Sequence, residues 1–391
     1  MKTKLEPREK ITLFLPRLHN NIRPLVDGLL KLNLNVSILV LREGVIEDHS
    51  EIDYIKLRCF TPMKQLFSLT NKEYKFQIPS PLQVYNHFKI HRPSYLLVRN
   101  DSNLAYCVIL FFGLIFKSKI LMYNQYPLIN PGIKKNLYNS FFYYLLNIRT
   151  ITPVLNKAFI MPSINISETP EGYGKRLQNY SNANFKNRSV WFPFGGGEND
   201  LKINKKNSTD GINILSIGKF EKRKNMDKAL SALSKVSISQ NKKINFTIIG
   251  EYDVSKKPYF DYLNEIANKY NTDSFQVSVI VNMSRNDLRK EFLKTHYFIL
   301  LSEEEIASYS QLEAFLYDCK VVVFYDNGFL NFLPYNSNYT VLYRKENFYQ
   351  DLNNIIFNNE LAKSYEYVAE YLKLFNNISL ASKLLSFFKQ I

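Results

Sequence analysis

Glutamate residues in the stretch LLSEEEIASYSQLEAFLYDCKVVVF, residues 300–324, raise the first question about chemistry. Glu305 closes a run of three glutamates, and Glu313 follows eight positions later inside an apolar segment that is predicted to be helical. Desolvating a carboxylate on such a face costs roughly several kcal/mol unless it finds a polar partner. Two interpretations are open: helix-end capping, or a polar ligand for Glu313.

Capping accounts for only part of this stretch. Ser308 is a good N-cap with Gln311 three residues later, and Ser310 and Glu313 repeat the same spacing. One helix needs one capping box, so a cap at Ser308 leaves Glu313 in the second turn without a capping role. Its two carboxylate oxygens would suit a pair of neighbouring hydroxyl groups, such as those of a ribose. Glu305, before the helix, would face the same site.

A basic loop follows an earlier predicted strand in the stretch SIGKFEKRKNMDKAL, residues 216–230. Gly218 ends the strand, and Lys219, Lys222, Arg223 and Lys224 crowd the loop before a helix. Backbone N–H groups at a helix start, with cations beside them, can bind an anion. A solvated run of charges with a turn glycine is the alternative, and the loop alone does not decide between them.

The elements that must position these residues alternate between strand-like and helix-like segments in two series. This pattern predicts α/β domains with largely parallel sheets. We expect two doubly wound Rossmann-like domains that face each other across a cleft, with C-terminal helices packing back on the N-terminal domain. Ligands of such sheets bind beyond the carboxyl ends of the strands. The Gly-, Asn- and Lys-rich residues 195–206 read as a linker, which gives domains at 1–195 and 207–365 and a helical tail at 366–391.

Taken together, the two motifs resemble the nucleotide-sugar domain of retaining family-4 glycosyltransferases (glycosyl transferases group 1), which have the GT-B fold. In that family a strand ends in Gly followed by Arg or Lys, a second Lys comes five residues later, and a Glu-x7-Glu motif opens a helix. The matching residues here are Lys219, Lys224, Glu305 and Glu313, with LEAF and KVVV in register. The likeness covers residues 190–330 well, including WFPFGGGEND, and the N-terminal half loosely.

The resemblance implies transfer of a sugar from a nucleotide-diphosphate-sugar donor to a saccharide or polyprenyl-linked acceptor in cell-envelope glycan synthesis, with retention at the anomeric carbon. It implies that Lys219 and Lys224 bind the donor diphosphate and stabilise the charge of the leaving nucleotide. No metal and no further cofactor is expected, because the lysines take the place of a metal. The implied catalytic residues are Lys219, Lys224 and Glu305, and the implied donor-binding residues are Gly218, Glu313, Ile306, Ala307 and Ser308.

The N-terminal half departs from the family pattern. PRLHNNIRP stands where a Gly-rich loop is frequent, and LMYNQYP lacks the histidine that often ends a strand facing the donor sugar. Ile306 also stands where Gly or Pro is usual. These departures leave an alternative open, a GT-B relative that binds sugar nucleotide or glycan without transfer. Possible N-domain contacts are His19, Asn100, Asp101, Asn124 and Gln125; for His19 and Asp101 a structural or capping role competes.

Charge is distributed unevenly along the chain, whose formal net charge is +16. Residues 1–195 hold 26 Lys and Arg against 12 Asp and Glu, or +14, and the remainder is +2. A basic half implies an anionic partner. Zinc-finger spacing, RNA-binding aromatic motifs and basic heptad helices are all lacking, so we expect no nucleic acid and favour an anionic membrane surface. The basic, aromatic residues 132–149 could lie on that surface or form a buried helix.

The remaining features indicate a globular protein in a reducing compartment. Hydrophobic residues make up 46% and charged residues 22%, which excludes a disordered chain. Three widely separated cysteines give no disulfide framework, and the N-terminus does not resemble a signal peptide. The longest apolar run, Leu104 to Phe116, is shorter than the roughly 20 residues of a membrane-spanning helix and is interpreted as a buried helix. We expect a cytoplasmic protein, peripheral on the inner face of the cell membrane.

Overall fold

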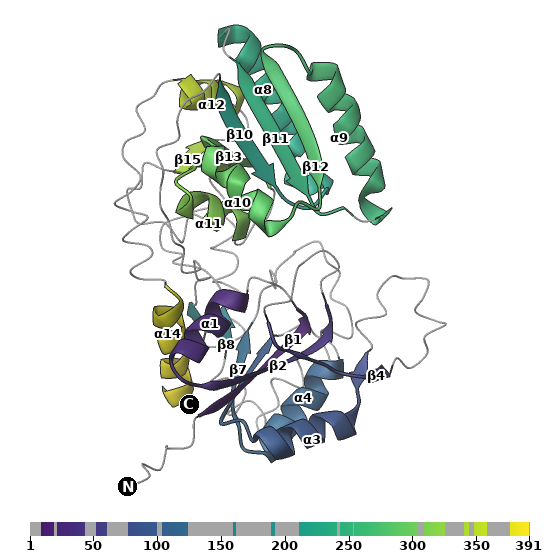
Figure 1. Ribbon diagram of the computed structural model, residues 1–391, viewed down its shortest axis with the longest axis vertical. Coiled ribbons are helices and arrows are strands. Elements are labelled where there is room, and N and C mark those ends of the chain that lie inside the picture. The colour runs from purple at the N-terminus through teal and green to yellow at the C-terminus, as the bar shows by residue number, and fades with distance from the viewer. Residues whose placement is uncertain are drawn as a thin grey trace. The chain divides into compact units, whose positions relative to one another are not determined.

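The computed structural model contains two α/β units (Figure 1). The first holds the elements from β1 to β9 together with the last helix, α14, and the second holds the elements from β10 to α12. The predicted domain limits fall outside the described residues and stay predictions. The structure describes residues 9–18, 22–43, 52–60, 77–99, 104–123, 159–161, 189–191, 211–240, 243–252, 254–302, 309–324, 340–343, 348–357 and 376–390.

The first unit is built on a parallel sheet with the strand order β3-β2-β1-β6-β7-β8-β9. A short antiparallel pair, β4 and β5, lies apart from it. The elements are β1 (Lys10–Arg17), α1 (Arg23–Lys31), β2 (Asn35–Arg42), β3 (Ile55–Lys56), β4 (Cys59–Phe60), β5 (Ile78–Pro79), α3 (Pro81–His91), β6 (Tyr95–Arg99), α4 (Leu104–Ile115), β7 (Lys119–Tyr123), β8 (Phe159–Met161), β9 (Ser189–Trp191) and α14 (Asn377–Gln390).

Side chains of this sheet alternate between two apolar layers, as the two-residue period of a strand requires. Leu13 of β1 packs with α1 and α14, whereas its neighbour Phe14 packs with α3 and α4. Both side chains are fully buried. Helices therefore cover both faces of the sheet, which explains why its central strands are almost continuously apolar.

The C-terminal helix α14 packs on α1 of the first unit, which confirms that the tail returns to the N-terminal domain (Figure 1). The two helices approach so closely at Gly28 that an added Cβ atom would collide with the backbone carbonyl of Asn377. Leu384 and Phe388 of α14 are fully buried there. Lys119 of β7 donates a hydrogen bond to the Phe388 carbonyl at 3.2 Å. The helix is thus an integral part of this core.

The second unit has a parallel sheet with the order β12-β11-β10-β13-β14-β15. Numbered within the unit, this is the doubly wound order 3-2-1-4-5-6. The elements are β10 (Ile212–Ile217), the 3₁₀ turn η5 (Lys222–Lys224), α8 (Met226–Gln240), β11 (Ile244–Gly250), the 3₁₀ turn η6 (Val254–Lys256), α9 (Lys257–Tyr270), β12 (Phe275–Val281), α10 (Arg285–Lys294), β13 (Tyr297–Leu300), α11 (Tyr309–Leu316), β14 (Lys320–Phe324), β15 (Thr340–Tyr343) and α12 (Phe348–Phe357).

Helices also cover both faces of this second sheet (Figure 1). One apolar cluster joins α8, α9 and α12 to inward residues of the strands, such as Ile214 and Ile299. On the other face, α10 and α11 contact β10, β13 and β14, and the Phe292 and Phe298 rings lie 6.3 Å apart. The predicted fold class, two Rossmann-like α/β domains, is confirmed.

Two features of the first unit differ from the sequence-based expectations. Helix α3 is absent from the predicted elements, although Ser80 caps it by accepting a hydrogen bond from the Gln83 N–H at 3.4 Å. Helix α4 occupies most of the predicted apolar helix, but it is not buried all round, because Phe111 is 57% exposed. Within the described segments, no helix has the length and hydropathy needed to cross a membrane.

Candidate functional site

The predicted site residues that the structure describes lie beside the point where the strand order of the second sheet reverses. β10 pairs with β11 on one side and with β13 on the other, all in parallel. Residues 218–225 follow β10, and residues 301–302 follow β13. Loops after adjacent parallel strands meet at one edge of a sheet, and the crevice at the reversal point is where such sheets bind ligands.

Lys224 and Gly218 are in direct contact at this edge. A Cβ atom at residue 218 would lie 3.5 Å from Lys224 Cε and 3.3 Å from Met226 Cε. The lysine stem therefore passes over the glycine, and the residue is only 7% exposed. A long lysine commonly buries its aliphatic stem and keeps its ammonium group at the polar end. Packing thus fixes the direction of the Lys224 side chain, which a solvated charge run would not require.

Asn225 connects the basic loop to the loop after β13. It adopts a left-handed conformation with φ 50°, which Asn tolerates better than most residues. Its buried side chain donates a hydrogen bond from Nδ2 to the carbonyl of Leu301 at 2.8 Å. This bond ties the turn that carries Lys224 to the beginning of the segment with the two glutamates, so the two sequence motifs are held together.

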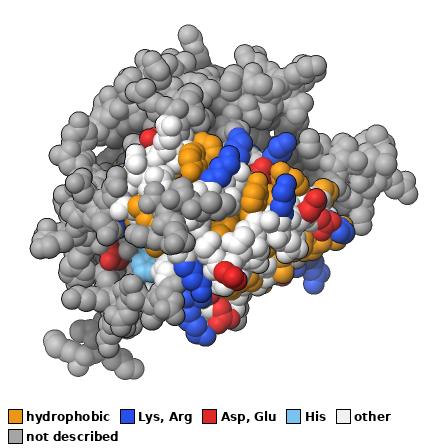
Figure 2. Space-filling view, turned by 90° about the horizontal axis from the view of Figure 1, so that it is seen from above, with side chains coloured by type: hydrophobic (Ala, Val, Ile, Leu, Met, Phe, Trp, Pro, Cys, Tyr) orange, Lys and Arg blue, Asp and Glu red, His pale blue; other side chains and the backbone are white. Residues whose placement is uncertain are grey.

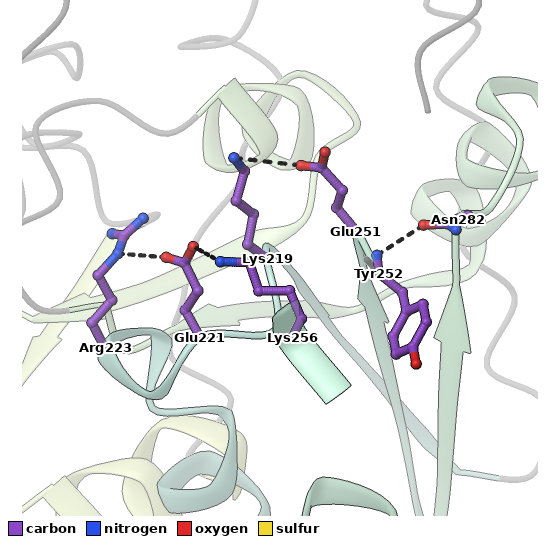
Figure 3. Close-up of polar contacts among 7 residues, drawn as sticks. All are labelled: Lys219, Glu221, Arg223, Glu251, Tyr252, Lys256 and Asn282. Atoms are coloured by element: carbon purple, nitrogen blue, oxygen red, sulfur yellow. Dashed lines mark hydrogen bonds and ion pairs between the residues drawn. The ribbon is translucent and has the colours of Figure 1, made fainter. Parts of the chain in front are cut away.

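Lys219 lies on the opposite side of the β10 end, toward β11. Its Nζ atom forms an ion pair with Oε2 of Glu251 at 3.6 Å (Figure 3). Glu251 directly follows Gly250, the last residue of β11. Gly250 permits this arrangement because an added Cβ would lie 2.5 Å from the Phe220 ring and 2.8 Å from the Gly218 carbonyl. The ammonium group of Lys219 is therefore near a carboxylate that an anionic ligand would have to displace or share.

The acidic residue inside the basic loop pairs with two cations. Glu221 accepts from Arg223 Nε at 2.8 Å and from Lys256 Nζ at 2.7 Å (Figure 3). Burial raises the pKa of Glu221, but Lys256 and Arg223 outweigh burial and lower this pKa overall. The carboxylate is thus ionised at neutral pH and neutralises part of the charge of the loop.

Backbone donors of this loop are already in use. The N–H groups of Glu221, Lys224 and Asn225 donate to carbonyls within the loop. The Asp227 N–H, in the first turn of α8, lies 3.3 Å from the Tyr259 hydroxyl oxygen. These four N–H groups are therefore not available for the anion binding that was predicted at this helix start. An anion at this loop would instead contact its cationic side chains.

Glu313 lies in the second turn of α11, which reaches the same strand end. Ser310, in the first turn, donates a hydrogen bond to the Ile217 carbonyl of β10 at 3.4 Å. The Glu313 side chain is partly buried, and desolvation raises its pKa to about 7, although Arg285 and Arg289 of α10 oppose this shift. The carboxylate thus lies between an apolar helix face and two arginines, and it titrates near neutrality.

The structure describes only part of the predicted site. Gly218, Lys219, Lys224 and Glu313 lie around the carboxyl end of β10, as described above. The others lie outside the described residues, namely Glu305, Ile306, Ala307, Ser308, His19, Asn100, Asp101, Asn124 and Gln125. Their roles stay predictions. Among the described residues, no group of three or more His, Cys, Asp or Glu side chains could hold a metal ion.

Sequence reasoning missed two residues of this edge, Asn225 and Glu251. Asn225 carries a usable signal, because an Asn between a lysine run and a helix start often adopts a left-handed conformation. Glu251 follows a strand that ends in Gly, which marks it as a residue at the carboxyl edge. Only the strand order, however, shows that β11 is adjacent to β10 and brings Glu251 to Lys219.

Comparison with known proteins gives the family of the second half of this chain. Residues 198–371 match the family described as "Glycosyl transferases group 1". No curated protein matches the sequence.

Solved structures match almost the whole chain. HepE of Anabaena, in complex with UDP and glucose, has a TM-score of 0.67 at 12% identity, over 98% of this chain and 100% of that one. Sucrose-phosphate synthase from Thermosynechococcus elongatus has a TM-score of 0.68 at 12% identity, over 98% and 99%. WaaG, a glycosyltransferase involved in lipopolysaccharide biosynthesis, has 0.59 at 14%, over 97% and 99%.

The fold and the matched domain define a GT-B protein, with two Rossmann-like units of which the second carries a glycosyl transferases group 1 domain. Residues 198–371 accordingly carry a glycosyltransferase domain of this group, as the resemblance of the motifs in that part of the chain implied.

Proposed function

We propose that the carboxyl edge around β10 is the donor site, and that Lys219 and Lys224 bind the diphosphate of the nucleotide sugar. The observation that carries this proposal is the contact of Lys224 with Gly218, which directs a nearly buried lysine to the strand end. Lys219 reaches the same end from the β11 side. Two cations flanking one strand end suit a ligand with two adjacent phosphates.

The proposed chemistry uses these cations as fixed charges. In transfer, the bond between the anomeric carbon and the diphosphate oxygen breaks, an acceptor hydroxyl oxygen bonds to that carbon, and the acceptor loses its proton. Negative charge then grows on the departing nucleoside diphosphate, and ammonium groups positioned before the reaction stabilise it most effectively. Glu313 would accept hydrogen bonds from the ribose hydroxyls, and Glu305 with residues 306–308 would contact the sugar. We propose retention at the anomeric carbon and no requirement for a metal.

We propose an acceptor of the cell envelope, either a saccharide or a polyprenyl-linked glycan. WaaG, one of the matched structures, is described as involved in lipopolysaccharide biosynthesis. The basic first half of the chain, with a net charge of +14 over residues 1–195, suits an acceptor on an anionic surface. We therefore place the protein in the cytoplasm, peripheral on the inner face of the cell membrane.

A panel of UDP-, GDP- and ADP-sugars tests the donor site. Binding is followed by thermal shift, and transfer by nucleotide release in the presence of envelope lipid extracts. We expect one nucleotide to raise the melting temperature and its sugar to be consumed. Stabilisation without any sugar transfer would instead favour a relative that binds sugar nucleotides without transfer. If no nucleotide and no free diphosphate stabilises the protein, the donor site is wrongly placed.

A matched pair of lysine variants assigns the effect to this edge. Lys224→Ala removes the nearly buried lysine, and Lys222→Ala removes an exposed lysine two positions earlier in the same turn. We expect kcat/KM to fall about 10²- to 10³-fold for Lys224→Ala, the typical loss when one transition-state donor is removed. Lys222→Ala should change it by less than about threefold, as an exposed charge does. Equal losses in the two variants would point to general charge attraction.

A further inference from the structure

Helix α4 presents an uncovered apolar face. All twelve of its residues, LAYCVILFFGLI, lack a charge, so the helix has no polar side to turn to water. Cys107 is exposed, Phe111 is 57% exposed, Leu114 41% and Ile115 52%. These positions follow one another at helical spacing and form one stripe. A helix that is apolar all round is normally covered on every side, so this stripe calls for a partner.

Helix α3 extends the stripe sideways. The two helices are in contact (Figure 1), and the Tyr85 ring of α3 lies 6.1 Å from the Phe112 ring, which lies 5.3 Å from the Phe111 ring. Leu82, one turn before Tyr85, is 68% exposed. The aromatic contacts make one continuous surface, which we call the α3–α4 face: Leu82, Tyr85, Phe111, Leu114 and Ile115.

The two helices of the α3–α4 face carry basic but no acidic residues. The described residues from 78 to 123, which span both helices, include no Asp or Glu. Exposed cations border the face, with Lys89 of α3 placed 5.8 Å from the centre of the Tyr85 ring and Lys117 two residues beyond α4. On the face of the molecule that Figure 2 shows, in contrast, Lys and Arg side chains lie among Asp and Glu side chains.

We propose that the α3–α4 face is the surface by which this protein lies on an anionic lipid bilayer. This inference rests on the membrane association included in the proposed function and adds the place of contact. Apolar side chains would enter the headgroup boundary, while the lysines would contact lipid phosphates. A second copy of the chain fits less well, because a twofold interface would bring Lys89 and Lys117 of both copies together with no described acid on this face to pair them.

Vesicle sedimentation with the full chain tests the apolar part. The triple variant Phe111→Ser, Leu114→Ser, Ile115→Ser should lower binding to phosphatidylglycerol-containing vesicles at least about tenfold, since each side chain loses apolar area that would leave water. Val254→Ser is the control, because Val254 is an 83% exposed apolar residue of the second unit. It should bind as the wild type does. Unchanged melting temperatures would show that both variants fold.

A charge variant tests the lipid headgroup. Lys89→Gln with Lys117→Gln should lower binding about tenfold, and added salt should weaken the wild type more than this variant. Lys235→Gln, an exposed lysine of α8, is the control. Vesicles of phosphatidylcholine alone should bind weakly. Equal binding to neutral and anionic vesicles would overturn the anionic-lipid proposal.

Two further outcomes would contradict the inference, and they are distinguishable. If the wild type binds no vesicles, the membrane association of the proposed function fails, whereas nucleotide stabilisation still reports on the donor site. If the wild type binds but the triple variant binds equally well, only the α3–α4 face is wrong. A wild-type dimer that the triple variant converts to a monomer, without vesicle binding, would assign the face to a second copy.

Discussion

The two units place a helix pair at the same point of the same topology, but the two pairs differ in chemistry. In the first unit α3 precedes and α4 follows β6, the strand beside β1; in the second, α10 precedes and α11 follows β13, the strand beside β10. The second pair carries Arg285, Arg289 and Glu313 near a strand end. The first pair presents exposed apolar side chains with lysines at their border.

This difference shows that the doubly wound topology sets where a helix lies and leaves its outward side free to vary. In α11, Leu312, Ala314, Phe315 and Leu316 are buried apolar residues, and the helix also carries a buried Gln311 and a partly buried Glu313. In α4, the residues turned away from the sheet are apolar as well. Helix α11 therefore contributes to a polar ligand site, whereas α4, at the equivalent position of the first unit, presents a surface for a partner.

The largest expected effect separates the buried and exposed sides of these two helices. Phe315→Ala in α11 removes a side chain that is 1% exposed, and should lower the free energy of unfolding by about 3–5 kcal/mol. Phe111→Ala in α4, at 57% exposure, should cost less than about 1 kcal/mol. Denaturant unfolding of the full chain measures both. A loss of several kcal/mol at Phe111 would mean that the α4 stripe is part of the fold's own core.

An intermediate effect should come from Glu313. The pKa of Glu313 in the folded protein, about 7, lies above the ordinary value of 4.5. The protonated carboxyl group therefore stabilises the fold below pH 4.5, and this stabilisation is lost as the pH rises through 7. Glu313→Gln lacks this loss and should be more stable than the wild type at pH 8, by roughly 1–3 kcal/mol, with little difference at pH 4.5. Thermal unfolding at both pH values checks this.

The same variant separates stability from binding. If the ionised carboxylate holds the ribose, wild-type affinity for the nucleoside diphosphate should fall as the pH drops through 7, and Glu313→Gln should bind more weakly at pH 8 without that pH dependence. Asp287→Asn on α10, which changes an exposed acid paired with Lys290, is the control. A variant that is more stable and binds equally well would leave Glu313 without a role in the donor site.

The smallest expected effect concerns Glu251, which pairs with Lys219 at exposures of 28% and 43%. Glu251→Gln should release Lys219 and remove a negative charge near the proposed diphosphate. Binding of the nucleoside diphosphate should therefore tighten, by about 0.2–1 kcal/mol, as for other exposed pairs. Asp261→Asn, which breaks the exposed pair with Lys257, should leave it unchanged. Weaker binding by Glu251→Gln would show that the glutamate positions Lys219 instead of competing for it.

Local patterns in the sequence predicted much of the fold but only part of the site. The period of apolar residues and the glycines after strands were enough to predict β10, β13 and α11. The same patterns could not show that Lys224 is nearly buried against Gly218, because that contact depends on the conformation of the turn between these two residues. Glu251 was missed for a related reason, since its contact with Lys219 depends on which strands are neighbours.

Helices α3 and α4 show a second limit of sequence reasoning. A run of apolar residues predicts burial when the partner is part of the chain, and the short run from Leu104 favoured a buried helix over a membrane span. Exposure of Phe111 could not be predicted, since apolarity alone does not tell a core face from a surface that a separate partner covers. Helix α3 escaped detection because Leu82 and Ile90, both strongly exposed, break its amphipathic pattern.

The position of α14 has a consequence for the order of folding during synthesis. Domains usually fold as they leave the ribosome, beginning at the N-terminus. Here the core of the first unit includes Leu380, Ala381, Leu384 and Phe388, each 1% exposed or less. These residues are translated after every element of the second unit, so the unit that begins first is completed last. Until then, the apolar side of α1 that packs on α14 stays uncovered in the nascent chain, which is the kind of exposed surface that chaperones protect.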